Sequence, residues 1–149
     1  MELTTRSIVF ENVISLHFTG NREQSVNYLK AEKKRLEMFN INFYPQISCS
    51  KVSLDKNNEY LIEVFSYIPC DENEFKHAKN DFNTIEIKNF GDVRSIEGKG
   101  DFDHFNKMAK YFHDTVNENE YKSDIFVYLS KEVTEDIDDL EFIFFTQVK

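Results

Sequence analysis

Residues 100–116, GDFDHFNKMAKYFHDTV, carry the clearest structural signal in this sequence. Apolar side chains recur there at steps of three and four residues, at Phe102, Phe105, Ala109, Phe112 and Val116. This spacing places them on one face of an α-helix. Asp101 precedes the first of them and suits the N-cap position, where a carboxylate accepts hydrogen bonds from unpaired backbone amides. We therefore predict an amphipathic helix that begins after Asp101.

Strands flank this predicted helix on both sides. Residues 85–97, IEIKNFGDVRSIE, alternate in the manner of a strand, and we expect a turn at 89–91 to interrupt it. Two more strands, at 124–130 and 139–148, close the chain around the acidic segment KEVTEDIDD. The second half of the sequence therefore has the order strand, helix, strand, strand.

The first half of the sequence shows the same order. A strand at 7–18, with a bulge near its middle, leads to a helix at 22–40, which side-chain oxygens of Thr19-Gly20-Asn21 can cap. Two strands follow, at 47–54 and 59–69, and a turn rich in Asp and Asn joins them. The two halves also match in spacing.

Glycines and glutamates mark the repeat. Gly100 follows Gly20 by 80 positions, and each precedes a predicted helix. Glu141 follows Glu63 by 78 positions, and each lies in the last strand of its half. The small difference between the two offsets corresponds to a difference in loop length.

We predict a single α+β domain that spans the whole chain. Duplicated βαββ units at 7–69 and 85–148 are joined by a linker at 70–84. Because strands outnumber helices, we expect an antiparallel sheet with the two helices on one face. The other face, or the groove between the halves, is left for a ligand.

The composition agrees with one folded domain and excludes several classes of protein. Of the 149 residues, 40% are hydrophobic and 15% aromatic, which is enough for a core and unlike a disordered chain. The net charge is -9 and the Lys and Arg residues are scattered, so no basic stripe is present to bind nucleic acid. No apolar run approaches the roughly 20 residues that cross a bilayer, and the N-terminus lacks a signal-peptide pattern. We expect a cytoplasmic protein that does not associate with membranes.

The reactive side chains show no catalytic or metal-binding pattern. Cys49 and Cys70 form no CxxC pair and are expected to be reduced thiols. The histidines form no HxxxH motif, and no GxSxG motif is present. The acidic segment 131–139 lacks the spacing of a calcium loop, and is either a solvated hairpin end or a docking surface for a basic partner. The sequence therefore predicts no metal, no cofactor and no catalytic residue.

Strand alternation places a glutamate beside aromatic or apolar side chains in each half, on the strand face turned away from the helices. The candidate ligand-binding residues are Glu63, Phe65 and Tyr67 in the first half and Tyr128, Glu141, Ile143 and Phe145 in the second. Carboxylates beside aromatic rings suit a small cationic or amphipathic molecule. The alternative is a solvated strand face with ordinary cross-strand ion pairs.

The second half, from VRSIEGKGDFDHFNKMAKYFHDTVNENEYK to LEFIFFTQV, resembles the effector-binding domains of the GyrI-like superfamily. The matching residues are Gly100-Asp101-Phe102 at the helix start, Asn119-Glu120-Tyr121 at the turn and Glu141 in the last strand, with Phe18-Thr19-Gly20, Pro45 and Glu63 to Pro69 in the first half. The resemblance implies a pseudo-twofold pair of βαββ units that form a central pocket. It also implies that this pocket accepts planar or cationic organic molecules, with Glu141 as a buried counter-charge, and that the chain is a non-catalytic binding module.

Two further interpretations stay open. The acidic, Phe-rich character and the opening LTTRSIVFENVISL look like those of small accessory proteins of type VII secretion loci in Gram-positive bacteria. That likeness would imply a chaperone-like role and a protein partner. The hydrolytic relatives of the GyrI-like fold would call for a pocket glutamate with an aromatic enclosure, roles that Glu141 and Tyr128 would take in a small hydrolase. The sequence leaves the oligomeric state unknown.

Overall fold

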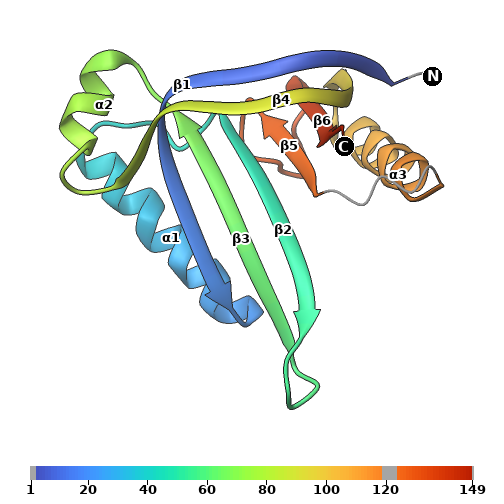
Figure 1. Ribbon diagram of the computed structural model, residues 1–149, viewed down its shortest axis with the longest axis horizontal. Helices are drawn as coiled ribbons and strands as arrows, with labels where there is room; N and C mark the ends of the chain where they lie inside the picture. The colour runs from blue at the N-terminus through green and yellow to red at the C-terminus, as the bar shows by residue number, and fades with distance from the viewer. Residues whose placement is uncertain (1–2, 119–123, 149) are drawn as a thin grey trace. The chain divides into compact units, whose positions relative to one another are not determined.

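The computed structural model describes residues 3–118 and 124–148, and Figure 1 labels their helices and strands. The chain divides into two compact units. We call residues 10–88 the N-terminal unit, and residues 1–9 together with 89–149 the C-terminal unit.

The division between the units falls inside two long strands, β1 (Thr4–Gly20) and β4 (Asn83–Gly100). Each of these strands therefore contributes residues to both units. The repeats predicted from the sequence, 7–69 and 85–148, instead divide within 70–84.

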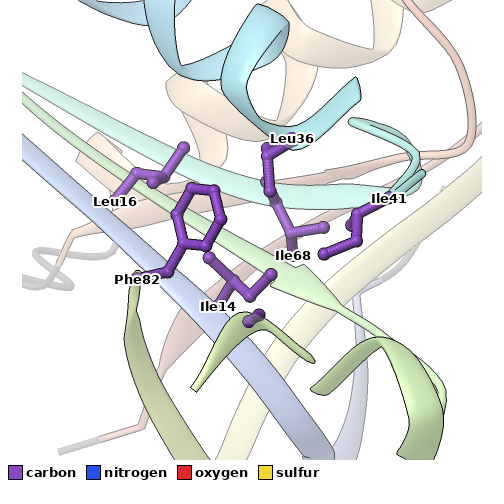
Figure 2. Packing of buried hydrophobic residues seen from close by; sticks show 7 residues of the cluster. Ile14, Leu16, Leu36, Ile41, Ile68 and Phe82 are labelled. Carbon is purple, nitrogen blue, oxygen red and sulfur yellow. The ribbon is translucent and has the colours of Figure 1, made fainter. Parts of the chain in front are cut away.

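In the N-terminal unit, β3 is the central strand of an antiparallel sheet and pairs with β1 and β2. Besides part of β1, the elements of this unit are α1 (Arg22–Met38), β2 (Gln46–Leu54), β3 (Tyr60–Pro69) and α2 (Glu72–Ala78). Figure 2 shows the labelled buried side chains of this unit gathered together, namely Ile14, Leu16, Leu36, Ile41, Ile68 and Phe82. They come from α1, from the strands and from the segments that follow the two helices, so one core joins these elements.

The start of α1 is set by reciprocal hydrogen bonds. The Asn21 side chain accepts from the Gln24 backbone N–H at 2.8 Å, and the Gln24 side chain accepts from the Asn21 N–H at 3.0 Å. Two backbone donors that the helix leaves unpaired are thereby satisfied. The cap comes from the predicted segment Thr19-Gly20-Asn21, and the capping residue is Asn21.

The C-terminal unit repeats this arrangement around β6. Its elements besides parts of β1 and β4 are α3 (Phe102–Glu118), β5 (Ile125–Leu129) and β6 (Leu140–Gln147). β6 pairs antiparallel with β4 on one side and β5 on the other. Helix α3 packs against one face of this sheet, where the buried residues are Ile96, Met108, Phe112, Val116, Leu140, Phe142 and Phe144.

The predicted fold class is confirmed, because each unit has the chain order strand, helix, strand, strand and an antiparallel sheet. Asp101 Oδ1 accepts from the His104 backbone N–H at 2.9 Å, as the sequence predicts for the start of α3. The predicted turn at Asn119-Glu120-Tyr121 lies outside the described residues. None of the helices within the described ranges has the length and hydropathy of a membrane-crossing segment.

The segment predicted as a linker contains a helix, α2. Asp71 caps it by accepting from the Glu74 N–H at 2.8 Å, and the Glu74 side chain accepts from the Asp71 N–H at 2.9 Å. Phe75 and Ala78 are buried. The helix is only 7 residues long, which is too short for its apolar side chains to show a period. The segment predicted as a linker, 70–84, therefore includes a short helix that the sequence pattern did not reveal.

The turn predicted at 89–91 is also wrong, because β4 runs through it as one strand of 18 residues. Gly91 has a φ of 71°, and Asn89 Oδ1 accepts from its N–H at 2.8 Å. Glycine adopts positive φ at little cost, so these residues make a local irregularity rather than a chain reversal. Asn12 in β1 has a φ of 55°, in the region where the sequence predicts a bulge.

Replacing Phe112 with Ala is expected to lower the free energy of unfolding by about 3–5 kcal/mol, because truncating a buried Phe leaves a cavity. Phe112 is fully buried and stacks on Phe144, with 6.0 Å between the ring centroids. The neighbouring Tyr111 is 36% exposed, and Tyr111→Ala is the matched control. Urea denaturation measures both variants. Losses of equal size would contradict the orientation of α3.

Neither Cys49 nor Cys70 takes part in a disulfide bond, and one of the two thiols has an altered acidity. Cys70 packs against the core of the N-terminal unit. Burial raises the pKa of the Cys70 thiol to about 11, and the negative charge of Glu74 contributes in the same direction. The folded protein therefore keeps the Cys70 proton at pH values where the unfolded chain has released it.

This difference predicts that stability declines as the pH rises from about 9 to about 11, because the folded state binds more protons than the unfolded state in that window. Cys70→Ala removes the group, so the decline should be shallower in this variant than in the unchanged protein. Thermal unfolding at a series of alkaline pH values measures the two slopes. Identical slopes would contradict the raised pKa.

Candidate functional site

The candidate site lies on the sheet of the C-terminal unit, on the face turned away from α3. The helix packs against Leu140, Phe142 and Phe144 of β6. Because side chains alternate along a strand, Glu141 and Ile143 project from the opposite face, as the sequence predicts.

Strand pairing assembles the site around Ile143. Glu97 of β4 and Tyr128 of β5 both lie opposite Ile143, one on each side. Glu141 is the next residue along the same face of β6, and Lys99 of β4 lies opposite it. A pocket of about 480 Å³ opens here, lined by Glu97, Gly98, Lys99, Tyr128, Glu141, Phe142 and Ile143. This volume is within the range of small-molecule sites.

Gly98 permits the close packing beneath the pocket. A Cβ atom at this position would lie 2.7 Å from the ring of Phe142, its partner across the strands. Because glycine has no side chain, the Phe142 ring packs directly against β4 and is only 1% exposed. A larger residue at position 98 would force the Phe142 ring or the strand beside it to shift.

Two carboxylates, those of Glu97 and Glu141, line the pocket together with the ammonium of Lys99, and the guanidinium of Arg6 lies beside Glu97. Lys99 Nζ lies 3.6 Å from Glu141 Oε1, and Arg6 Nη1 lies 3.7 Å from Glu97 Oε2. The Glu141 side chain is 61% exposed and the Glu97 side chain 70%. Exposed ion pairs contribute about 0–1 kcal/mol. Another cation can therefore replace Lys99 or Arg6 at little cost.

Tyr128 supplies an aromatic wall. Burial raises the pKa of its hydroxyl, and the charge of Glu141 raises this pKa further. The phenol therefore stays protonated through neutral pH and adds no negative charge of its own. A neutral aromatic ring beside a carboxylate attracts cations through the negative face of its π-system.

The N-terminal unit has a related cluster around Glu63 and Phe65. His17 Nε2 lies 2.9 Å from Glu63 Oε2, and the His17 ring stacks on Phe65 with 4.4 Å between centroids. Lys51 Nζ lies 5.4 Å from the centroid of the Phe65 ring. The chain's own basic side chains therefore already engage both of these predicted residues.

The two clusters occupy corresponding positions, because the pairing registers of the units correspond with offsets of 80 in β1 and β4 and 78 in β3 and β6. Glu141 corresponds to Glu63, and Glu97 corresponds to His17. The C-terminal unit thus has a second carboxylate where the N-terminal unit has a histidine bonded to its glutamate. Lys51 adds positive charge to the N-terminal cluster. The C-terminal cluster differs in having two carboxylates, each in an ion pair longer than a hydrogen bond.

The structure separates the residues predicted for the site. The pocket brings together three of them, Tyr128, Glu141 and Ile143. Phe145 is fully buried and packs against Phe90 and Phe126, at centroid distances of 5.1 and 5.3 Å, so it belongs to the core. Tyr67 is 8% exposed in the N-terminal unit, and Lys88 Nζ lies 4.8 Å from its ring centroid.

Glu97 and Lys99 were not predicted as site residues, although both line the pocket. Only the pairing of β4 with β6 brings them beside Glu141. A signal is nevertheless present in the run Glu97-Gly98-Lys99-Gly100. In a strand this run places two charged side chains on one face and two glycines on the other.

The acidic segment 131–139 lies between β5 and β6. Lys131 Nζ donates a hydrogen bond to Asp139 Oδ2 at 2.5 Å, which raises the pKa of Lys131 and lowers that of Asp139. Among the residues that the structure describes, no group of three or more His, Cys, Asp or Glu side chains is placed to hold a metal ion. Docking of a basic partner on this segment stays a prediction.

Comparison with known proteins gives structural matches only, since no protein-family model and no curated protein matches the sequence. The structure of SAV2435 bound to tetraphenylphosphonium matches with a TM-score of 0.51 at 8% identity, covering 98% of this chain and 93% of that one. A hydrolase from Listeria innocua matches with a TM-score of 0.40 at 11% identity, covering 97% and 91%. An uncharacterized conserved protein from Listeria innocua matches with a TM-score of 0.41 at 14% identity, covering 97% and 92%. The likeness to SAV2435 supports the conclusion that this chain has the GyrI-like α+β fold predicted from its sequence.

Proposed function

We propose that this chain is a non-catalytic binding module, and that the pocket of the C-terminal unit binds a small organic cation with an apolar body. The observation that carries the proposal is the position of Glu141 beside Ile143 and Tyr128, with Glu97 across the pocket. A carboxylate at the edge of apolar and aromatic surface attracts the charge of such a ligand and holds its body.

Lys99 acts as an internal competitor in this proposal. Its ammonium lies 3.6 Å from Glu141, beyond hydrogen-bond distance, and its side chain is 66% exposed. A ligand cation that approaches Glu141 releases Lys99 to water, where an ammonium is well solvated. The ligand gains more than Lys99 loses, because its apolar body also leaves water against Ile143 and Tyr128.

The likeness to SAV2435 supports the same ligand class. Tetraphenylphosphonium, which is bound to SAV2435, is an organic cation whose body consists of phenyl rings. The pocket described here offers a negative charge and apolar contact surface, the two features that such a molecule requires.

The sequence also predicts ligand contacts in the N-terminal unit, at Glu63, Phe65 and Tyr67. We do not propose these residues as the main contacts. His17 is bonded to Glu63, and Lys51 lies over the Phe65 ring, so a ligand cation meets positive charge there. We assign the principal contacts to the C-terminal unit for this reason. Ligand binding in the groove between the halves stays a prediction.

The two alternative functions stay predictions from the sequence. A small hydrolase would need Glu141 and Tyr128 to act on a bound ester, and an accessory protein of a secretion locus would need a protein partner. A binding module needs only the charge and the contact surface of the pocket. We therefore propose binding first.

Replacing Glu141 with Gln is expected to weaken binding of tetraphenylphosphonium about fivefold, which corresponds to about 1 kcal/mol, the upper end of the range for an exposed ion pair. The substitution removes the negative charge and keeps the shape of the side chain. Glu135→Gln is the matched control, because it removes the same charge from an exposed position outside the pocket lining. Isothermal titration calorimetry at low salt measures the three dissociation constants.

Equal effects of Glu141→Gln and Glu135→Gln would show that only net charge matters and would reject the assigned site. An unchanged protein that does not bind tetraphenylphosphonium or any other organic cation would reject the function itself. Lys99→Met is expected to change the affinity in the opposite direction from Glu141→Gln. This substitution removes the competing ammonium and should strengthen binding by about threefold, within the range of an exposed ion pair.

A further inference from the structure

The pocket has a second carboxylate that binding of a single cation does not use. Glu97 lies opposite Ile143, and Glu141 lies two residues before Ile143 on β6, so the two glutamates are diagonal neighbours on paired strands. Diagonal neighbours in an antiparallel sheet are about 7–8 Å apart. Both side chains project from the same face, so their carboxylates can contact a ligand at two separate points.

The chain's own cations hold these carboxylates only loosely. The Lys99–Glu141 and Arg6–Glu97 contacts, at 3.6 and 3.7 Å, are both longer than hydrogen bonds. Arg6 Nε is buried and has no hydrogen-bond partner, so the guanidinium does not clamp Glu97 through paired hydrogen bonds. Both carboxylates can therefore accept hydrogen bonds from a ligand.

The surface between the two carboxylates is apolar. Ile143 lies directly across from Glu97, and Tyr128 borders Ile143 on the other side. Lys99 shows which chemical group fits beside Glu141, because its side chain is an alkyl chain that ends in an ammonium. A free alkylammonium would place the same group there and lay its methylene chain on Ile143.

We propose that the pocket binds organic dications, with one positive charge at Glu141, the other at Glu97 and an apolar linker across Ile143. Polymethylene diamines are the simplest ligands of this class. The inference rests on the proposed function, because it uses the same pocket and Glu141, and it adds a requirement for a second charge.

The N-terminal unit provides an internal contrast. At the position of Glu97 it has His17, which is bonded to Glu63. A dication would meet one carboxylate that is already paired and no second one. Binding of two charges is therefore a property of the C-terminal unit.

The test compares hexamethylenediamine with hexylamine, which have the same methylene chain and differ by one charge. Nuclear magnetic resonance titration of the unchanged protein is expected to show that the diamine binds at least about tenfold more tightly. Its two equivalent ends explain only about twofold of this preference. The diamine should also lose affinity more steeply with added salt, because two charge contacts are screened instead of one.

Three variants locate the two charges. Glu97→Gln is expected to weaken the diamine about fivefold, down to the twofold advantage that its two ends give, and to leave hexylamine unchanged within about twofold. Glu141→Gln is expected to weaken both ligands. Glu135→Gln is the control for net charge, and it should leave the affinity for each of the two ligands unchanged. Glu97 and Glu141 are mostly exposed, so these substitutions leave the core intact.

Each remaining outcome overturns the inference. The dication site is rejected if the diamine binds no more than about twofold more tightly than hexylamine. It is also rejected if a larger preference for the diamine is retained in Glu97→Gln. Glu141-dependent binding of hexylamine or tetraphenylphosphonium without a diamine preference would reject the dication site and leave the single-cation function standing. Failure of all three probes to bind would reject both.

Discussion

The antiparallel pairing of β4 with β6 is the constraint on which the candidate site depends. This pairing places Glu97 opposite Ile143, and a residue larger than glycine at position 98 would force the Phe142 ring or the strand beside it to shift. A slip by one residue would turn Glu141 into the core and Phe142 toward water. The packing that stabilises the C-terminal unit against α3 therefore also holds the charges of the pocket in place.

Duplication of one βαββ pattern produces two clusters of opposite character. In the N-terminal unit, Glu63 has a close partner in His17, whose ring also stacks on Phe65, so this cluster stabilises itself. In the C-terminal unit, the ammonium of Lys99 lies 3.6 Å from the corresponding glutamate, Glu141, which is beyond hydrogen-bond distance. A carboxylate in such a long and exposed ion pair can exchange its partner for another cation at little cost. We propose the C-terminal unit as the binding unit for this reason.

The sequence predicts the parts of this structure that local patterns determine. Five apolar residues at steps of three and four fit a helix and not a strand, and α3 forms where they lie. Helix α2 has too few residues to show a period, and the sequence around Gly91 fits a kink in a strand as well as a turn. Alternation places Phe145 on the face of the site, yet Phe90 covers it, and only tertiary packing reveals this. Glu97 was missed because its role follows from strand pairing, which a single sequence does not specify.

The most direct test of binding at the C-terminal pocket is to map backbone amide chemical shifts as tetraphenylphosphonium is added. Binding beside Glu141 predicts that the largest changes in chemical shift occur at residues 97–99 and 140–143 and at Tyr128. Changes of similar size at Glu63 and Phe65 are not expected, because His17 already engages that cluster. Largest changes in the N-terminal unit, with none at 97–99 and 140–143, would contradict the assignment of the site.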